Sequence, residues 1–205
     1  MDVTAAQKIR ADAKEATRRA LLEAGLAETI EGRGAIPSIE AMCKRAGYTR
    51  GAFYVHFTDR EHFISELLDW ILSNIIRALF VTSTEEAADL EEVVSRFTTA
   101  ISRGEWPDVE QNLQAVYMAV LRELRPGSAL RDRHTELMNS IAERLERLIV
   151  ADQKAGRLRK DVDGNEMAML LLLIAIGSIM WEDVGIDMNA PALGRSLLKL
   201  MSRPR

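Results

Sequence analysis

The sequence has few residues that could form disulfide bonds or flexible linkers. Its 205 residues include a single cysteine, Cys43, so no disulfide can form within the chain and the fold does not depend on an oxidising compartment. We expect Cys43 to be a small buried side chain on a helix. Glycine- or proline-rich linkers, internal repeats and the alternating pattern of strands are also missing. These absences leave an all-α protein without a flexible linker between domains.

Motifs that carry catalysis are absent as well. The sequence has no H-E-x-x-H, no phosphate-binding loop, no G-x-G-x-x-G and no G-x-S-x-G. The three histidines, His56, His62 and His134, are not spaced as metal ligands on one helix face. The Asp and Glu residues fall mostly on polar helix faces or in caps, where contact with water accounts for them. We therefore expect no enzyme activity, no cofactor and no metal.

The overall composition is that of a folded soluble protein, with 47% hydrophobic and 28% charged residues. The net charge of −4 is unevenly distributed. Residues 1–60 contain ten Lys or Arg and eight Asp or Glu, a balance of +2, whereas residues 61–205 contain seventeen and twenty-three, a balance of −6. The N-terminus is charged and lacks the apolar core of a signal peptide, so we expect a cytoplasmic protein without a membrane anchor.

The most informative stretch runs from Ser38 to Phe63 and predicts two short helices joined by a tight turn. Ser38 is a favourable N-cap for a helix that ends at Ala46. Gly47 follows where a left-handed residue is needed, because only glycine adopts that conformation without steric cost. Thr49 then caps the second helix. A turn of three residues between two short helices is the helix-turn-helix arrangement, in which the second helix enters the major groove of DNA.

The second helix separates an apolar face from a polar one. Phe53 and Phe57 are four residues apart and are expected to pack inward, whereas Arg50 and Tyr54 share the opposite face. Arginine is the side chain best matched to the N7 and O6 atoms of guanine. Small neighbours let the helix backbone approach base edges, and other donors on this flank suit phosphate oxygens. The predicted DNA-contacting residues are Ser38, Thr49, Arg50, Gly51, Ala52, Tyr54, His56 and Arg60, and Thr58-x-x-Glu61 has the pattern of a capping box for a third helix.

The string AGYTRGAFYVHFTDREHF resembles the DNA-binding motif of TetR-family transcriptional regulators. The matching positions are Gly47, Gly51, Tyr54, His56, Phe57 and Arg60. Two positions depart from the pattern. Ala52 stands where the family often has a hydroxyl residue, and Arg60 replaces the more usual lysine. The resemblance implies a three-helix DNA-binding head, a C-terminal helical domain for ligand binding and dimerisation, and a ligand-responsive repressor.

The rest of the chain predicts further helices, about nine in all, from apolar residues at helical spacing. A first helix, from about Thr4 to Ile30, completes the head. Its Lys8, Arg10 and Lys14 are either phosphate contacts or a solvated charged face. We place a DNA-binding domain at residues 1–60 and the ligand-binding and dimerisation domain at residues 61–205. Helices are expected over Asp59–Thr82, Ser83–Arg103, Asp108–Leu124, Ser128–Ala155, Met167–Trp181 and from Asn189 to the C-terminal region.

The most apolar segment, MAMLLLLIAIGSIMW, extends from Met167 to Trp181. It is short for a membrane span and is flanked by Glu166 and by Glu182-Asp183. A helix that is apolar on all sides must be covered on all sides. We expect this helix and the last one to pair with their copies in a homodimer, although burial within one monomer is the alternative. A twofold dimer would present two heads to a palindromic DNA site.

A small-molecule effector is expected in the C-terminal domain. Methionines and aromatics on converging helices suit an apolar or amphipathic ligand, although the same side chains could simply form a core. The residues in question are Phe97, Trp106, Tyr117, Met118, Met138, Met169 and Trp181. Two other functions stay open: a helical protein-interaction module that retains the helix-turn-helix fold, and a helical ligand carrier or small enzyme. Neither of them needs the donors of Arg50, Tyr54, His56 and Arg60.

Overall fold

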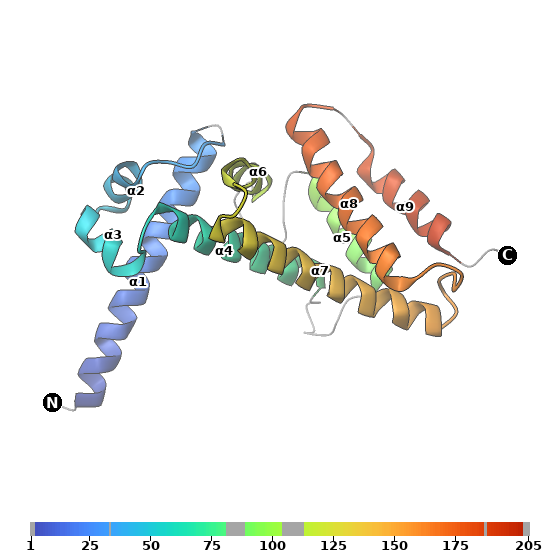
Figure 1. Cartoon of the computed structure of the whole chain (residues 1–205), viewed down its shortest axis with the longest axis horizontal. Helices are drawn as coiled ribbons and strands as arrows, with labels where there is room; N and C mark the ends of the chain where they lie inside the picture. Colours follow the sequence, from blue (N-terminus) through green and yellow to red (C-terminus); the bar gives the residue numbers. More distant parts are fainter. Residues whose placement is uncertain (1–2, 33, 81–88, 104–112, 187, 203–205) are drawn as a thin grey trace. The chain divides into compact units, whose positions relative to one another are not determined.

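The computed structural model describes residues 3–32, 34–80, 89–103, 113–186 and 188–202. Over these ranges the chain forms nine α-helices and no strand beyond one isolated antiparallel bridge, between Leu158 and Ser202. Figure 1 labels these helices and colours them in chain order, from blue at the N-terminus to red at the C-terminus. Their bounds are α1 Val3–Glu31, α2 Ile39–Ala46, α3 Arg50–His56, α4 Arg60–Phe80, α5 Leu90–Arg103, α6 Leu113–Glu123, α7 Ala129–Lys154, α8 Gly164–Asp183 and α9 Ala190–Met201. The predicted all-α fold class is confirmed.

The chain divides into two compact units, and the boundaries between them fall within α4, α6 and α7. Unit 1 comprises residues 1–69 and 115–131, and unit 2 comprises residues 70–114 and 132–205. Unit 1 therefore contains α1–α3, the start of α4 and most of α6. Unit 2 contains α5, α8 and α9 with the remaining parts of α4 and α7.

Unit 1 is built around an aromatic cluster. Phe53, Phe57 and Phe63 are at most 1% exposed, and their ring centroids lie 5.0–5.8 Å apart. Gly25 on α1 lets Phe63 approach, because a Cβ atom there would lie 2.4 Å from the Phe63 ring. Large fully buried side chains around this cluster are Leu21, Leu26, Met42, Ile64, Leu67 and Leu68. The cluster holds α3 against α1 and α4 through one face and leaves its other face free.

Unit 2 is built on close contact between α5 and α9. Gly194 on α9 faces Thr98 and Val94 on α5, and a Cβ atom at Gly194 would lie 2.8 Å from Thr98 Cγ2. Buried apolar side chains of this unit include Ile71, Leu90, Val93, Ile101, Ile149, Met167 and Ala168. The end of α9 is tied to the loop before α8 by the bond from the Arg159 N–H to the Met201 carbonyl oxygen, 3.0 Å.

One predicted helix start differs from the structure. The capping box at Thr58 is wrong, because the Asp59 carboxylate accepts the N–H of His62 (2.8 Å) and caps α4 instead. Glu61, which was expected to complete that box, accepts the N–H of Leu130 (3.0 Å) at the start of α7. The helix start predicted at Ser83 and the one at Asp108 lie outside the described residues.

Candidate nucleic-acid interface

The segment from α2 to α3 has the geometry of a helix-turn-helix. The Ser38 hydroxyl accepts the N–H of Ala41 (3.2 Å) and begins α2, and the Thr49 hydroxyl accepts the N–H of Ala52 (3.2 Å) and begins α3. Gly47 has φ 74° and ψ 24°, the left-handed conformation, which lets the chain leave α2 and turn at once. The polar caps and the glycine therefore set the angle at which α3 emerges.

The outer face of α3 is open to solvent. Arg50 and Gly51 are exposed, and Tyr54 keeps 49% of its surface accessible, while Phe53 on the inner face is fully buried. Hydrogen bonding with the Tyr54 side chain raises the pKa of Arg50, so the guanidinium stays charged. Apart from the Thr49 hydroxyl at 3.6 Å, nothing lies near a Cβ built on Gly51. The result is a low, exposed ridge with a permanent positive charge.

His56 and Ala52 lie closer to the protein than this ridge. Both are half-buried, and in the described part of the chain the His56 Nδ1 atom is buried without a hydrogen-bond partner. Burial lowers the pKa of His56, and the positive charges of Lys14 and Arg18 on α1 lower it further. His56 is therefore neutral near pH 7.

Arg60 is held within unit 1. Its guanidinium donates to both carboxylate oxygens of Glu123 (3.0 and 2.8 Å) and to the carbonyl oxygen of Ile36 (3.0 Å). Beside Glu123 on α6, Arg122 donates to the carbonyl oxygen of Gly34 (3.1 Å). These bonds fasten α6 to the loop after α1 and to the start of α4. No local pattern in the sequence indicates this contact, because 63 residues separate Arg60 from Glu123.

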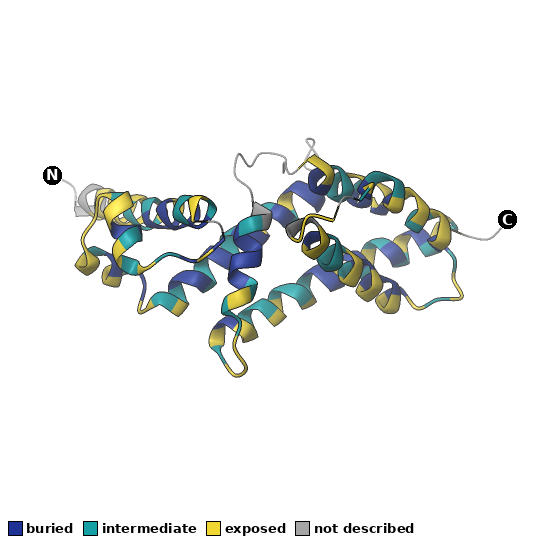
Figure 2. Cartoon of the chain, turned by 90° about the horizontal axis from the view of Figure 1, so that it is seen from above, coloured by how far each residue is buried: buried dark blue, intermediate teal, exposed yellow. Residues whose placement is uncertain are grey.

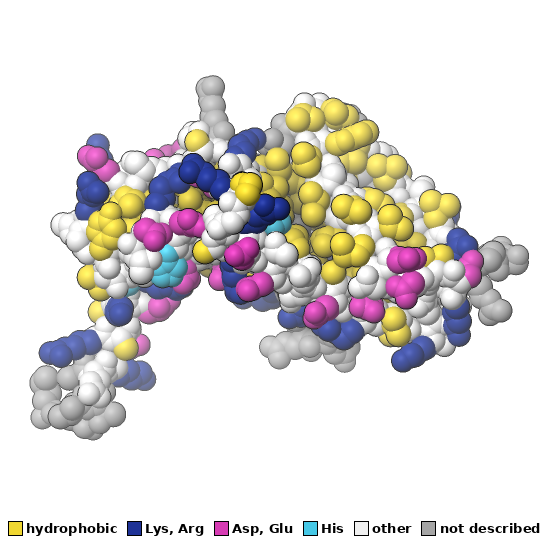
Figure 3. Space-filling model, in the orientation of Figure 1, with side chains coloured by type: hydrophobic (Ala, Val, Ile, Leu, Met, Phe, Trp, Pro, Cys, Tyr) yellow, Lys and Arg dark blue, Asp and Glu magenta, His cyan; other side chains and the backbone are white. Residues whose placement is uncertain are grey.

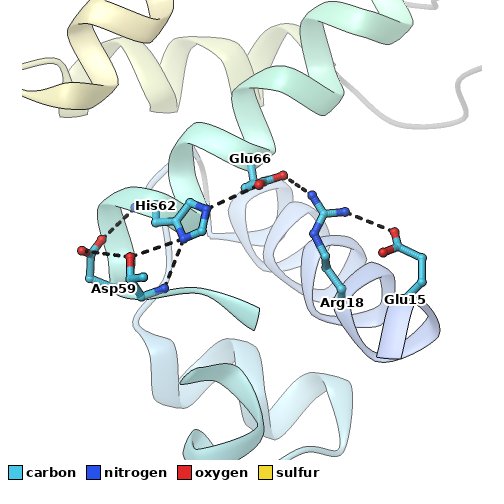
Figure 4. A network of polar contacts seen from close by, with 6 residues as sticks. Glu15, Arg18, Asp59, His62 and Glu66 are labelled. Carbon is cyan, nitrogen blue, oxygen red and sulfur yellow. Dashed lines mark hydrogen bonds and ion pairs between the residues drawn. The ribbon is translucent and has the colours of Figure 1, made fainter. Parts of the chain in front are cut away.

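A second polar network joins α1 to α4 (Figure 4). Arg18 lies between Glu15 on its own helix and Glu66 on α4. Glu66 also pairs with His62 (3.4 Å), whose Nδ1 atom accepts the backbone N–H of Thr58 (3.1 Å). Tyr48, beside the cap of α3, places its hydroxyl 3.5 Å from the Thr17 hydroxyl on α1. The orientation of α1 relative to α4 thus depends on polar contacts besides the aromatic core, and the contact between Thr17 and Tyr48 joins α1 to the start of α3.

The predicted effector residues fall in different units. Tyr117 and Met118 are buried in unit 1, Phe97 and Met138 are half-buried in unit 2, and Trp106 lies outside the described residues. Met169 and Trp181 are exposed on α8, so within one monomer they do not line a cavity. An open depression of about 480 Å³ at the start of α5 is polar and contains none of the seven; its lining is Asp89, Glu91, Glu92, Ser95 and Arg96. Within the described ranges, no cluster of three or more His, Cys, Asp or Glu side chains could hold a metal ion.

The helix α8 exposes a continuous apolar face. By length and composition alone its segment Gly164–Trp181, with a mean hydropathy of 1.6 and 33% of it buried, could cross a membrane. Its exposed residues, however, gather on one side, because they recur at helical spacing. Figure 3 shows hydrophobic side chains spread over α8 and α9 with few charges between them. We call this the α8–α9 apolar face; its exposed members are Met169, Leu170, Leu173, Ile174, Met180, Trp181, Leu193 and Leu200.

Comparison with known proteins gives a short sequence match and a full-length match in structure. No protein-family profile matches the chain. YwcC of Bacillus subtilis, an uncharacterized HTH-type transcriptional regulator, is 38% identical over 56 residues, which is 27% of this chain and only 25% of YwcC.

Solved structures match over nearly the whole chain. A protein from Rhodococcus sp. assigned to the TetR family of transcriptional regulators has a TM-score of 0.72 at 18% identity, covering 90% of this chain and 98% of that one. NalD of Pseudomonas aeruginosa, the secondary repressor of the MexAB-OprM multidrug efflux pump, has a TM-score of 0.68 at 20% identity, covering 95% and 100%. FadR of Bacillus subtilis, solved with stearoyl-CoA, has a TM-score of 0.67 at 18% identity, covering 89% and 96%. The resemblance first indicated by the motif around Gly47 is thus confirmed, and the chain has the fold of TetR-family transcriptional regulators.

Proposed function

We propose that the protein is a sequence-specific DNA-binding transcriptional regulator, acting as a ligand-responsive repressor in the cytoplasm. The observation that carries this proposal is the exposed Arg50–Tyr54 ridge of α3, held outward by the buried Phe53 and Phe57. Arg50 would donate to a guanine edge in the major groove, and Tyr54 to the edge or to a flanking phosphate. Ser38, Thr49 and His56 would be further donors, and Gly51 and Ala52 would keep the surface low.

In this proposal Arg60 has a different task from the one that the sequence suggested. Its guanidinium already donates to Glu123 and to the Ile36 carbonyl oxygen, so a phosphate would have to compete with a carboxylate for it. We keep the DNA-binding domain at residues 1–60, with the start of α4 and most of α6 as its supports.

Selection of bound sites from a pool of random duplexes tests the function directly. The full chain should enrich one sequence, and a palindrome would indicate two heads. Arg50→Ala should lower the affinity for that sequence by about 1–3 kcal/mol, roughly fivefold to 150-fold, and relax the preference at one base position. Arg77→Ala, which removes an arginine from α4 in unit 2, is the matched control and should bind as the wild type does.

Two results would contradict the proposal: no enriched duplex, or equal affinity of wild type and Arg50→Ala. Binding that is absent at every salt concentration would favour the alternative functions, a protein-interaction module or a ligand carrier that retains this fold. DNA binding through cations must instead weaken steeply as salt rises.

We further propose that the protein is a homodimer joined through the α8–α9 apolar face. Its members recur along one side of α8 and continue onto α9, and contiguous apolar surfaces of this kind mark interfaces. Gly177 lies among them, and a Cβ built there would meet nothing within 4 Å in the monomer. The monomer therefore does not need a glycine at this position, whereas a second helix packed closely against α8 would.

Sedimentation of two Ile→Glu variants tests the dimer. Ile174→Glu places a charge in the α8–α9 apolar face, and Ile9→Glu places the same charge at an exposed isoleucine of α1. We expect a dimer for the wild type and for Ile9→Glu, and a monomer for Ile174→Glu. Dimers of equal strength in all three would contradict this interface.

The effector is the least defined partner. We propose an apolar or amphipathic molecule, with Phe97 and Met138 of unit 2 as its first candidate contacts, because both are half-buried; Tyr117, Met118 and Trp106 are the remaining candidates. Met169 and Trp181 are proposed to serve the dimer instead, since both are exposed on α8. A test is to screen acyl chains and drug-like cations for release of the selected duplex. If no compound class releases DNA or shifts the melting temperature, a ligand-responsive repressor is excluded.

A further inference from the structure

The N-terminal part of α1 packs on nothing in unit 1. Every residue from Gln7 to Ala16 is exposed, including Ile9 at 68%, whereas burial begins at Thr17 and is complete at Leu21. Figure 2 shows this stretch as the exposed end of the chain next to the N-terminus. We call residues 7–16 the α1 arm. A helical segment of this length draws no stability from burial, and isolated helices of this size are marginal in water.

One side of the α1 arm is mainly cationic. Arg10 and Lys14 are four residues apart and therefore share a face, on which Arg18 follows after another four. The neighbours on this face are Gln7, Ala11, Ala13 and Thr17, which are small or uncharged. Asp12 falls on the other side of the helix, together with Lys8 and Arg19. Glu15 lies at the edge of the cationic face, where it pairs with Arg18 (3.2 Å). Lys and Arg side chains mark the projecting end of α1 in Figure 3.

This cationic face continues towards the recognition helix. Lys14 and Arg18 both act on His56, at the end of α3: after burial, their charges lower its pKa further, and the carboxylate of Glu15 opposes them. Thr17 lies beside the Tyr48 hydroxyl, one residue before the cap of α3. The two ends of α3 are therefore both close to the row of residues that begins at Arg10. Arg18 is fixed by Glu15 and Glu66, which leaves Arg10 and Lys14 as the exposed charges of the row.

We propose that the α1 arm is a second DNA-contacting element, which lies as a helix on the sugar-phosphate backbone next to the groove that α3 occupies. Arg10 and Lys14 bind phosphates, and the small residues between them allow the helix to approach closely. The inference rests on the proposed function, because α3 must bring the duplex to this place. Charge complementarity selects the partner: Arg10 and Lys14, the two exposed cations of this face, have no carboxylate between them and fit a polyanion with regularly spaced charges.

The salt dependence of DNA binding tests this interaction. In the full chain, Arg10→Gln/Lys14→Gln removes two charges from the cationic face, and Lys8→Gln/Arg19→Gln removes two charges from the opposite face of the same helix. The slope of log affinity against log salt for the selected duplex should fall by about 2 per protomer in the first variant, at roughly 0.9 for each phosphate that the variant no longer neutralises. The second variant should keep a slope close to that of the wild type.

A proline tests whether the helix itself is required. Ala13→Pro breaks the helix of the α1 arm without changing its charge. Proline has no N–H to donate to the carbonyl oxygen of Ile9, and its ring clashes with that carbonyl group. We expect an unchanged melting temperature, since residues 7–16 contribute no core, and a DNA affinity as low as that of Arg10→Gln/Lys14→Gln.

The possible outcomes separate the two proposals. If the wild type enriches no duplex, the proposed function fails and this inference fails with it. If the wild type binds its duplex and the two double variants have the same slope, only the α1 arm is excluded. Wild-type affinity in Ala13→Pro would exclude a helical contact. Loss of self-association in Arg10→Gln/Lys14→Gln with an unchanged slope would show that the arm binds a second copy of the chain, and would overturn the inference.

Discussion

The bond between Arg60 and Glu123 allows a quantitative test of how unit 1 is held together. Glu123→Gln keeps the shape of the side chain and one acceptor oxygen, but removes the charge and one of the two parallel bonds. Hydrogen bonds to charged groups contribute about 1.5–3 kcal/mol each when shielded from water. The two side chains are 36% and 23% exposed, so water screens part of this contribution. We expect Glu123→Gln to lower the free energy of unfolding by about 1–2 kcal/mol, which for a chain of this length corresponds to roughly 2–8 °C in melting temperature.

The lowered pKa of Glu123 also predicts how the stability lost in Glu123→Gln depends on pH. The hydrogen bond from Arg60 holds the pKa of Glu123 below its ordinary value of 4.5. A group with a lowered pKa in the folded state contributes its full stability above the pKa of the unfolded chain, and loses it as the pH falls through the folded value. The difference between wild type and Glu123→Gln should therefore be constant from about pH 6 to 8 and shrink in acid below about 4.5.

Urea unfolding at several pH values measures both quantities. The matched control is Glu136→Gln, which removes the partner of Arg133 (3.0 Å) in a more exposed pair three residues apart on α7. Such pairs contribute about 0–1 kcal/mol. Equal losses for Glu123→Gln and Glu136→Gln, or a difference that grows in acid, would refute the account of Arg60 as a structural clamp.

For four further substitutions the direction of the stability change can be predicted. Burial raises the pKa of Tyr117 to about 12, so the wild type should lose stability as the pH rises from 10 to 12. Tyr117→Phe should remove this loss. Unfolding curves over this pH range measure it, with Tyr48→Phe as the control. Gly194→Ala should destabilise the protein by about 1–3 kcal/mol, because its Cβ would meet Thr98 Cγ2 at 2.8 Å. Gly177→Ala, made in the monomeric Ile174→Glu variant, should instead stabilise it by up to about 1 kcal/mol. Melting temperatures in the opposite order would refute this. Gly47→Ala should cost about 1–2 kcal/mol through its φ of 74° alone, and a melting temperature no lower than that of Gly51→Ala would contradict a conformational role.

The local elements were readable from the sequence because each depends on neighbouring residues. Ser38, Thr49 and Asn189 act as N-caps where cap residues precede apolar periodicity, and Gly47 adopts the conformation that its position between two helices requires. The separation of Arg50 and Tyr54 from Phe53 follows from helical geometry alone. These features predicted the fold class and the outward ridge of the candidate interface.

The features that sequence reasoning missed depend on contacts between distant segments. No residue near Arg60 in the sequence indicates its bond to Glu123. Likewise, no residue near Glu61 indicates that its carboxylate accepts the N–H of Leu130. The error at Thr58 has a local cause, because two adjacent residues, Thr58 and Asp59, both have side chains that can cap a helix.

The apolar helix α8 shows a different limit. Its residues are hydrophobic on every side, so no polar stripe distinguishes the buried face from the exposed one. Met169 and Trp181 were accordingly expected beside a ligand, although both lie on the exposed side of the monomer.

The discontinuity of unit 1 affects how the protein is made. Residues 1–69 leave the ribosome well before residues 115–131, and Glu61 caps the start of a helix that has not yet been synthesised. Translation at about 5–20 residues per second leaves the nascent head without α6 for several seconds, since interactions distant in sequence form last. A fragment truncated shortly after residue 69 would lack Glu123 and would expose the carbonyl groups of Gly34 and Ile36. The helix α3 therefore reaches its full support only when more than half of the chain has emerged.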